Sequence, residues 1–255
     1  MLKSLRERSL DNLPVGSREF FAAQKRLILR RPLLKWCYDG WYAHLIEDAR
    51  SVPGQGALLE LGSGGSYLKD LEPAVITSDV VAGVADRVVD GRALPFPDAS
   101  LKAILLTHVF HHIPEVTSFF REAQRVLVPG GVISMIEVAH TPLARFFFRN
   151  FHHEPYRDEI EEWSFLQQHS MMDSNQALSW MVFVRDRDKF RKLFPDLEVE
   201  VFSFLPWLTY LFSGGVTGRC LVPDFLAPLM IGLEKLLKPL SPVFALHWHI
   251  RVRKR

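Results

Sequence analysis

The sequence has little of what marks several specialised protein classes. It has 2 cysteines among 255 residues, Cys37 and Cys220, and no metal or redox motif surrounds either. We therefore expect free thiols and a reducing, cytoplasmic environment. The formal net charge is only +2, which gives no reason to expect a nucleic-acid partner. Repeats and low-complexity tracts are absent, and a content of 48% hydrophobic residues is typical of a globular protein with a sizeable core.

Long apolar runs are also missing. The first 16 residues carry charges without an apolar stretch, so we expect no signal peptide. The longest apolar segment begins at Leu221 and is interrupted by Asp224 and Glu234, so it falls short of the ~20 uninterrupted apolar residues that a membrane-spanning helix needs. Leucines recur at helical spacing from Phe225 to Leu237. This pattern favours core packing, and peripheral contact with a membrane is the alternative.

Short apolar runs alternate with helical patterns along most of the chain. This alternation predicts an α/β protein with a parallel sheet covered by helices on both faces. The predicted strands are 57–61, 74–79, 86–90, 102–107, 131–138, 199–205 and 245–252. We divide the chain into an N-terminal helical cap at 1–50 and a domain at 51–255, with an apolar insertion at 206–244. An aromatic stripe in the cap, including Tyr38 and Tyr42, predicts packing against the sheet or a lid over a substrate.

The segment LLELGSGGSYL (58–68) carries the strongest functional signal. It reads as a buried strand that ends in a glycine-rich turn. Open α/β sheets bind ligands at this edge, and glycine lets the backbone approach a ligand closely. A dinucleotide fingerprint needs a third glycine or an alanine where Tyr67 stands, so that fingerprint fails. Asp79 ends the next strand and can accept hydrogen bonds from a ribose diol, while Asp90 can accept from an adenine amino group.

Together with DGRALPFPD, THVFHHI and RVLVPGGVISMIE, this segment resembles the class I methyltransferases of the type 11 group, from about Leu58 to Val138. The resemblance implies a Rossmann-like, doubly wound, seven-stranded sheet with the last strand antiparallel. It also implies S-adenosyl-L-methionine (AdoMet) as the cofactor. The cofactor-binding positions that it implies are Glu60, Gly62, Ser63, Gly64, Gly65, Asp79, Asp90, Gly91, Thr107 and His108. One departure is the short stretch after Asp79, where we expect the usual helix to be missing.

Histidines and carboxylates follow the predicted strands that face this site. The candidate catalytic residues are His111, His112, Glu137 and His140. A histidine near the transferred methyl group can act as a general base toward a hydroxyl group, but this pair also fits a role in organising the loop. Glu137 could orient a histidine or bind the methyl acceptor.

Two further segments leave alternatives open. His152, His153 and Glu154 fit an exposed loop or, with Trp163, a pocket for the methyl acceptor. Because adjacent ligands rarely converge on one ion, we expect no metal there. SGGVTGR (213–219) fits a flexible loop or a phosphate cradle.

The resulting hypothesis is an enzyme that transfers a methyl group from AdoMet to an oxygen of a small-molecule or carbohydrate-type acceptor. The alternatives are action on a lipid-linked or macromolecular substrate, and a non-catalytic module that binds AdoMet. A dinucleotide-dependent oxidoreductase is disfavoured by Tyr67. The Asn-Pro-Pro-aromatic signature of amino-nitrogen methylation is absent, because THVFHH stands in its place.

Overall fold

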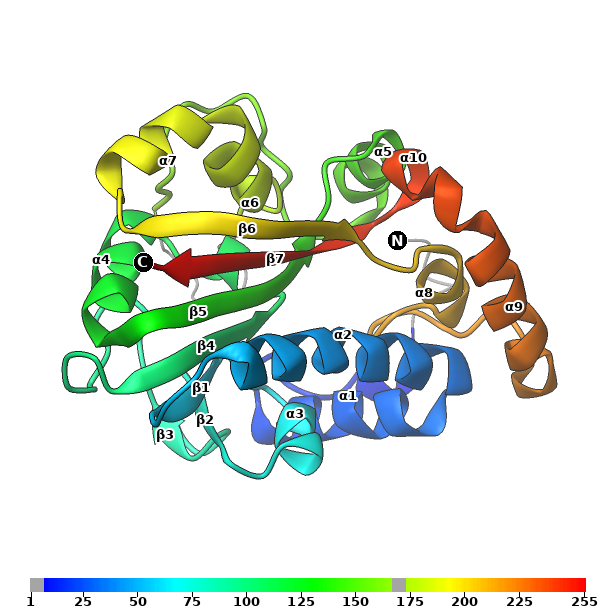
Figure 1. Cartoon of the computed structure of the whole chain (residues 1–255). Helices are drawn as coiled ribbons and strands as arrows, with labels where there is room; N and C mark the ends of the chain where they lie inside the picture. Colours follow the sequence, from blue (N-terminus) through cyan, green and yellow to red (C-terminus); the bar gives the residue numbers. More distant parts are fainter. Residues whose placement is uncertain (1–6, 167–172) are drawn as a thin grey trace.

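The structure is a computed structural model that describes residues 7–166 and 173–255. Seven strands form one sheet in the order β3-β2-β1-β4-β5-β7-β6 (Figure 1). They are β1 (Ala57–Leu61), β2 (Val75–Asp79), β3 (Arg87–Val88), β4 (Leu101–Thr107), β5 (Leu127–Val138), β6 (Leu197–Phe204) and β7 (His247–Lys254). Strands β1 to β5 pair in parallel, and β7 is antiparallel to β5 and β6. The predicted seven-stranded sheet with an antiparallel last strand is confirmed.

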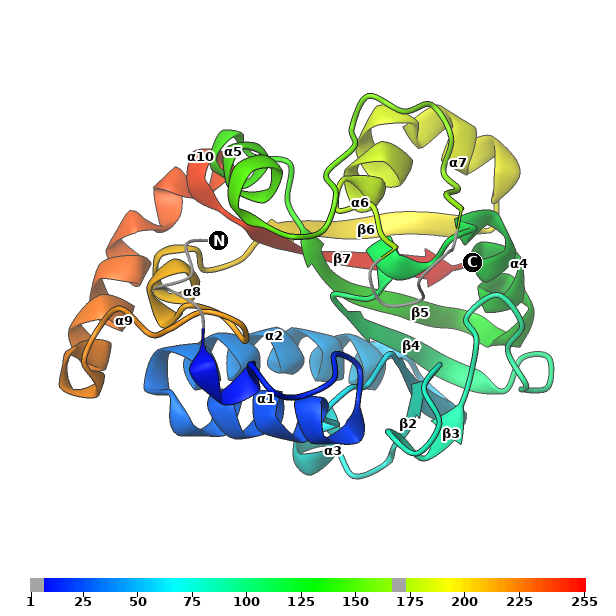
Figure 2. The same cartoon turned by 180° about the vertical axis from the view of Figure 1, so that it is seen from behind.

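Two N-terminal helices precede the sheet, as predicted. They are α1 (Arg18–Arg30) and α2 (Pro32–Ser51). The Ser17 hydroxyl accepts the Phe20 N–H at the start of α1, and Pro32 occupies the first turn of α2, where its missing N–H costs nothing. A 3-10 turn, η2 (Arg8–Leu10), lies ahead of them. Helix α2 lies along the sheet in Figures 1 and 2.

Helices cover both faces of the sheet because alternate strand residues point to opposite sides. Ala103 and Leu105 of β4 pack with α2 and α3 (Tyr67–Leu71). Ile104 and Leu106 pack with the other face's helices (Figure 2). These are α4 (Val116–Val126), α6 (Leu178–Trp180), the π-helical turn η4 (Met181–Arg185) and α7 (Arg187–Leu193). The doubly wound arrangement therefore follows from the period-two burial of the strands.

No helix separates β2 from β3: residues 80–86 are turns and bends, as expected from the short stretch after Asp79. The third strand is shorter than the predicted 86–90, with only Arg87 and Val88 in β3. Asp90 instead forms an isolated bridge with Ala93. Elsewhere, η3 (Phe110–His112) follows β4, and α5 (Pro142–Phe151) follows β5.

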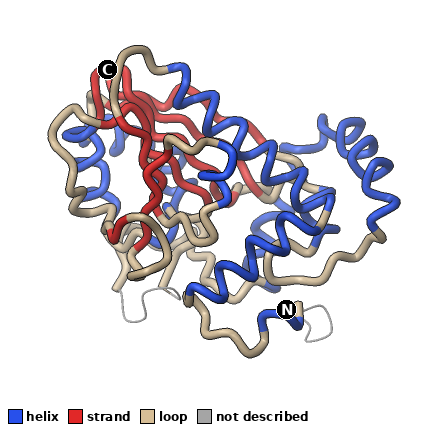
Figure 3. The backbone as a smooth tube through the Cα atoms, turned by 90° about the horizontal axis from the view of Figure 1, so that it is seen from below, coloured by secondary structure: helices blue, strands red, loops and turns tan. Residues whose placement is uncertain are grey.

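The chain between β6 and β7 forms α8 (Leu208–Ser213), η5 (Asp224–Leu226), α9 (Ala227–Leu237), η6 (Lys238–Leu240) and α10 (Ser241–Phe244). Helix α9 lies at the outer end of the molecule, away from the C-terminal end of β7 (Figures 1 and 3). The expectation of core packing for its leucines is wrong, since Leu229 and Leu236 are 68% and 74% exposed. The inward-facing residue is Glu234, whose carboxylate accepts the N–H groups of Trp207 and Thr209 at the start of α8. Within the described ranges, no helix is long and apolar enough to cross a membrane.

Candidate active site

A cavity of about 330 Å³ opens where the parallel strands end, beside the point where the strand order reverses between β1 and β4. All ten residues that the resemblance implied for cofactor binding line it: Glu60, Gly62, Ser63, Gly64, Gly65, Asp79, Asp90, Gly91, Thr107 and His108. We call this part of the wall the glycine-loop half. His112, His153 and Glu154 line another part, which we call the histidine half. Helix α1 adds Phe21 and Gln24 to the wall.

Glycine is required in the loop after β1 for two reasons. Gly62 has a φ of +64°, in the left-handed region that favours glycine, and a Cβ there would lie 2.4 Å from Cγ2 of Val109. Gly64 has a φ of +48°, and its Cβ would meet the Phe21 ring at 3.1 Å. The loop can therefore lie closely between β4 and α1 only because these positions lack side chains.

Asp79 fixes the loop from the end of β2. One carboxylate oxygen accepts the N–H of Gly64 at 3.2 Å, and the other accepts the N–H of Val81 at 3.0 Å. A carboxylate oxygen has more than one lone pair, so both oxygens can still accept from a diol. Asp90, by contrast, is paired with the Arg92 guanidinium, which lowers the pKa of the Asp90 carboxyl.

Buried polar atoms in the glycine-loop half lack partners. Glu60 Oε2 and His108 Nε2 have no hydrogen-bond partner among the residues that the structure describes. Burial raises the pKa of Glu60 to about 8 and lowers the pKa of His108 to about 4, so both side chains are uncharged at neutral pH. His108 also has a φ of +56°, a strained conformation that occurs mostly at functional sites. Unsatisfied buried groups of this kind fit a polar ligand such as a nucleoside cofactor.

Glu137 organises the turn after β4. Its Oε1 accepts the N–H groups of Val109 and Phe110 at 3.0 and 2.8 Å, and its Oε2 lies 2.6 Å from Nδ1 of His111. Glu137 is fully buried and does not line the cavity. It therefore positions η3 and His111, as the orienting alternative predicted, and does not itself contact a methyl acceptor.

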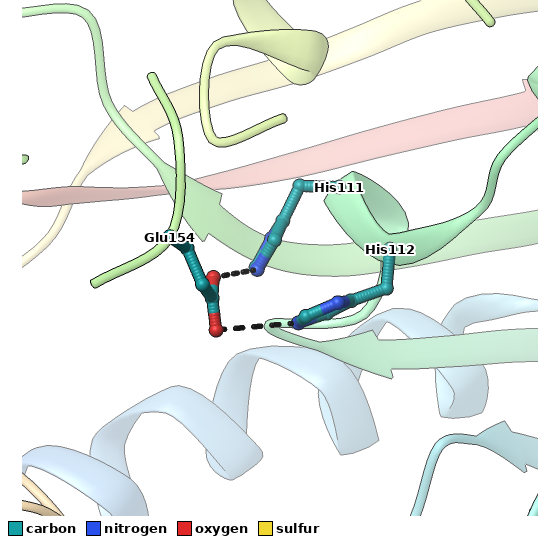
Figure 4. Close-up of side chains that lie close together, drawn as sticks. All are labelled: His111, His112 and Glu154. Atoms are coloured by element: carbon teal, nitrogen blue, oxygen red, sulfur yellow. Dashed lines mark ion pairs between the residues drawn. The ribbon is translucent and has the colours of Figure 1, made fainter. Parts of the chain in front are cut away.

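His111 lies between two carboxylates. Its Nδ1 faces Glu137, and its Nε2 lies 3.3 Å from Oε2 of Glu154 (Figure 4). Burial opposes a charge on His111, but the attraction of Glu137 and Glu154 outweighs burial and raises its pKa to about 10. His111 is thus a poor general base at neutral pH.

His112 is the candidate catalytic histidine that faces the cavity. Its Nε2 lies 3.7 Å from Oε1 of Glu154 (Figure 4). Its Nδ1 lies 3.4 Å from the carbonyl oxygen of Asp173. Burial and the neighbouring His111 charge lower its pKa to about 4. A neutral imidazole at this position has a free lone pair.

His140 does not join these residues. Its ring stacks on Trp180, with centroids 3.8 Å apart, and its Nδ1 lies 2.7 Å from the Tyr156 hydroxyl. It is absent from the cavity wall, because the chain turns into α5 directly after β5 and carries it to the other side. The interpretation of His140 as a second base is therefore set aside.

The segments 152–154 and 213–219, for which the sequence left two interpretations open, also contribute residues to the cavity wall. The Glu154 side chain is only 11% exposed, so the exposed-loop interpretation is wrong for Glu154, while the neighbouring His153 side chain is 52% exposed. Trp163 does not join it, since its indole N–H donates to Asp186 away from the cavity. In the 213–219 loop, Val216 and Thr217 line the cavity. Arg31 binds the carbonyl oxygens of Ser213, Gly215 and Gly218, so this loop is tied to the cap and turns carbonyl groups inward.

Comparisons with known proteins agree with this geometry. Residues 59–135 match the family model described as "Methyltransferase domain". The 27-O-demethylrifamycin SV methyltransferase of Amycolatopsis mediterranei is 41% identical over 58 residues, which cover 21% of each chain. The chain thus spans only about a fifth to a quarter of the length of the curated relatives it matches.

Two solved structures share the fold over nearly the whole chain. An S-adenosylmethionine-dependent methyltransferase from Thermotoga maritima, described as a possible histamine N-methyltransferase, matches with a TM-score of 0.53 and 14% identity. That match covers 93% of this chain and 98% of the other. The geranyl diphosphate C-methyltransferase of Streptomyces coelicolor, in complex with Mg²⁺, geranyl diphosphate and S-adenosyl-L-homocysteine, matches with a TM-score of 0.50 and 15% identity, over 98% and 89% of the two chains.

Proposed function

We propose that this chain, which matches the methyltransferase-domain model over residues 59–135, is an AdoMet-dependent methyltransferase that methylates an oxygen of a small-molecule or carbohydrate-type acceptor. One observation carries the proposal. The ten residues expected to bind the cofactor line the same cavity as His112 and Glu154. One cavity would therefore hold both a methyl donor at the first set and a hydroxyl group at the second.

The glycine-loop half fits the parts of AdoMet. Asp79 would accept hydrogen bonds from the ribose hydroxyls, and Asp90 and Gly91 would flank the adenine. Glu60, Thr107 and His108 face the methionine portion, where an uncharged Glu60 can donate as well as accept. Bound AdoMet supplies a methyl group on a sulfonium, which is ready for in-line displacement.

The cap and the 213–219 loop form part of the cavity wall. Phe21, Tyr38 and Tyr42 from the cap and Val216 from the loop line it. Both tyrosines are buried against the sheet and also line the cavity, so the packing and the substrate-contact interpretations of the aromatic stripe are compatible. Enclosure excludes water and fixes the alignment of the reacting groups, from which much of the rate acceleration comes.

An oxygen nucleophile fits the histidine half best. Methyl transfer to a hydroxyl group requires loss of its proton, and His112 and Glu154 both face the cavity with lone pairs available. The name of the Amycolatopsis relative designates an O-demethylated acceptor, which supports the same choice. Several hydroxyl groups on one carbohydrate-type molecule would satisfy the polar side chains of this half together.

The test is methyl transfer to a panel of hydroxylated small molecules, including free sugars and glycosides, followed by formation of S-adenosyl-L-homocysteine and by the mass of the product. We expect one added methyl group on oxygen. A methylated amine or carbon, with no O-methyl product, would reject the oxygen acceptor while leaving the methyltransferase assignment intact. Binding of AdoMet without turnover of any acceptor would favour the non-catalytic alternative.

The exposed face of α9 supports a second candidate, action on a lipid-linked methyl acceptor at a membrane surface. Phe225, Leu229 and Leu236 point outward beside Lys235 and Lys238, a combination that suits an anionic bilayer. Co-sedimentation with vesicles containing anionic lipid tests this, with Leu229→Glu and Leu236→Glu as the variants. Equal sedimentation of variant and wild type, or none of either, rejects it. The cytoplasmic location stays a prediction from cysteine usage.

A further inference from the structure

We propose that His111, His112 and Glu154 form a binding site for a divalent transition-metal ion such as Zn²⁺, at the wall of the cavity where the methyl acceptor is proposed to bind. One ligand atom from each residue lies within 4.8 Å of the other two. The inference rests on the proposed function for its role and on the geometry alone for its existence.

The distances fit a metal centre. In a tetrahedral site with bonds of about 2.0–2.2 Å, neighbouring ligand atoms lie about 3.3–3.6 Å apart. The separations from Nε2 of His111 and Nε2 of His112 to the Glu154 oxygens are 3.3 and 3.7 Å. Figure 4 shows both imidazoles projecting from η3 toward the one carboxylate. Adjacent histidines converge here because η3 is a tight 3-10 turn and Glu154 approaches from a separate segment.

The surrounding groups are those of a metal site. A metal-bound histidine usually donates its other ring N–H to a carboxylate or carbonyl oxygen. Nδ1 of His111 lies 2.6 Å from a Glu137 oxygen, and Nδ1 of His112 lies 3.4 Å from the carbonyl oxygen of Asp173. Each imidazole therefore directs its Nε2 toward Glu154. The amide nitrogen of Gln176 also lies 3.3 Å from Nε2 of His111 and would have to move when an ion binds. The buried Gln176 also contacts Glu154 and leaves its Oε1 without a partner among the described residues.

A second buried histidine–carboxylate cluster, around Asp48, differs from this one in its charged neighbours. Asp48 contacts His249 and also pairs with the Arg251 guanidinium at 2.9 Å. Glu137 and Glu154 converge on His111, yet across residues 7–166 and 173–255 no Lys or Arg lies within salt-bridge distance of either. In the metal-free protein a proton on His111 supplies the positive charge between these two carboxylates, and a divalent cation bound at Nε2 would replace that proton.

Imidazole with one carboxylate selects Zn²⁺, Fe²⁺ or Co²⁺ over Mg²⁺, which prefers oxygen ligands alone. Three protein ligands leave a position open, as in catalytic zinc sites. His112 and Glu154 line the cavity, so that position can take an oxygen of the methyl acceptor. A hydroxyl group bound to such an ion loses its proton more easily.

The experiment is titration of chelator-treated protein with Zn²⁺ by calorimetry and with Co²⁺ by visible absorption, in the absence of AdoMet and of any methyl acceptor. We expect about one equivalent of Zn²⁺, a d–d absorption band of four- or five-coordinate Co²⁺, and no competition by Mg²⁺. Glu154→Gln and His112→Gln should each weaken Zn²⁺ binding about 100-fold. Glu137→Gln should weaken it about 10- to 100-fold, through the orientation of His111.

His44→Gln is the control, because His44 is an exposed histidine of α2 whose ring stacks on His249 and does not line the cavity. Circular dichroism melts confirm that each variant folds. Absence of stoichiometric Zn²⁺ binding, or equal binding by wild type and Glu154→Gln, would overturn the proposal. Binding of S-adenosyl-L-homocysteine to the same chelated protein is measured separately, so failure of the metal site and failure of the proposed function give different results.

Discussion

The glycine-loop half and the histidine half of the cavity are built in different ways. The first is built largely from the ends of β2, β1 and β4, which are neighbours in the sheet. Their residues meet because parallel strands end at one edge. The second joins η3 to Glu154, which lies some forty residues further along the chain, and depends on Glu137 behind it. The first half suits a cofactor shared by many enzymes, and the second is where a particular methyl acceptor would be selected. A mutation in the histidine half should therefore lower turnover without lowering cofactor affinity, and a mutation in the glycine-loop half should lower cofactor affinity.

The largest expected effect is on turnover. His112→Gln should lower kcat/KM about 10²- to 10⁴-fold, the usual contribution of a group that assists proton removal. Affinity for S-adenosyl-L-homocysteine should stay within about twofold, since His112 is assigned to the histidine half. Steady-state kinetics and calorimetry on the same preparation measure the two quantities. Parallel loss of affinity and turnover would show that the halves are not separable.

A smaller effect is expected on folding, from the loop after β1. Gly62→Ala should destabilise the protein by about 2–4 kcal/mol, because left-handed strain adds to overlap with Val109. Gly83→Ala is the matched control. Gly83 has a φ of +78°, and a Cβ at this position would have no other atom within 4 Å. Backbone strain alone should therefore destabilise this variant by about 1–2 kcal/mol. Denaturant unfolding gives both values. Equal costs would mean that the contact with Val109 is unimportant.

The smallest effect concerns pH and the histidine half. In chelator-treated, metal-free protein the folded pKa of His111 is raised to about 10 against about 6.5 in an unfolded chain, so its stabilising effect is complete below pH 6.5 and is lost as pH rises through 10. We expect the free energy of unfolding to fall by roughly 1–3 kcal/mol between pH 7 and 10. Glu60, with a pKa of about 8, adds a loss in the same direction.

The His111→Gln variant separates the two contributions. Because it retains Glu60, it should keep the Glu60 part of the pH dependence and lose the rest. Identical pH slopes for wild type and His111→Gln would contradict the assignment of a protonated His111 between Glu137 and Glu154.

The sequence pattern predicted the parallel strands, and the resemblance to class I methyltransferases implied the antiparallel last strand and the residues of the glycine-loop half, which line one cavity. Strand periodicity and the glycine turn are local signals, and a parallel sheet brings successive strand ends together without further information. The histidine half needed tertiary structure. Nothing local relates Glu154 to His111, and His140 looked equivalent to Glu137 until α5 carried it away from the cavity.

The prediction of core packing for helix α9 was wrong for a related reason. Its leucine spacing predicted an apolar face toward the core. In the structure the side of the helix that faces inward carries Glu234, a hydrogen-bonding residue. Glu234 binds the N–H groups at the start of α8 and so turns Leu229 and Leu236 outward. Periodicity identifies an amphipathic helix, but not which of its faces is covered.

The most direct test of the central claim is calorimetric titration of the purified chain with S-adenosyl-L-homocysteine, for wild type, Asp79→Asn and Asp79→Ala. Asp79→Ala removes charge-assisted hydrogen bonds to the ribose and the anchor of Gly64, so we expect affinity to fall about 100-fold, with Asp79→Asn intermediate. Micromolar binding by wild type with this order of variants would support the account. Absence of binding by folded wild-type protein, or equal binding by all three, would contradict it.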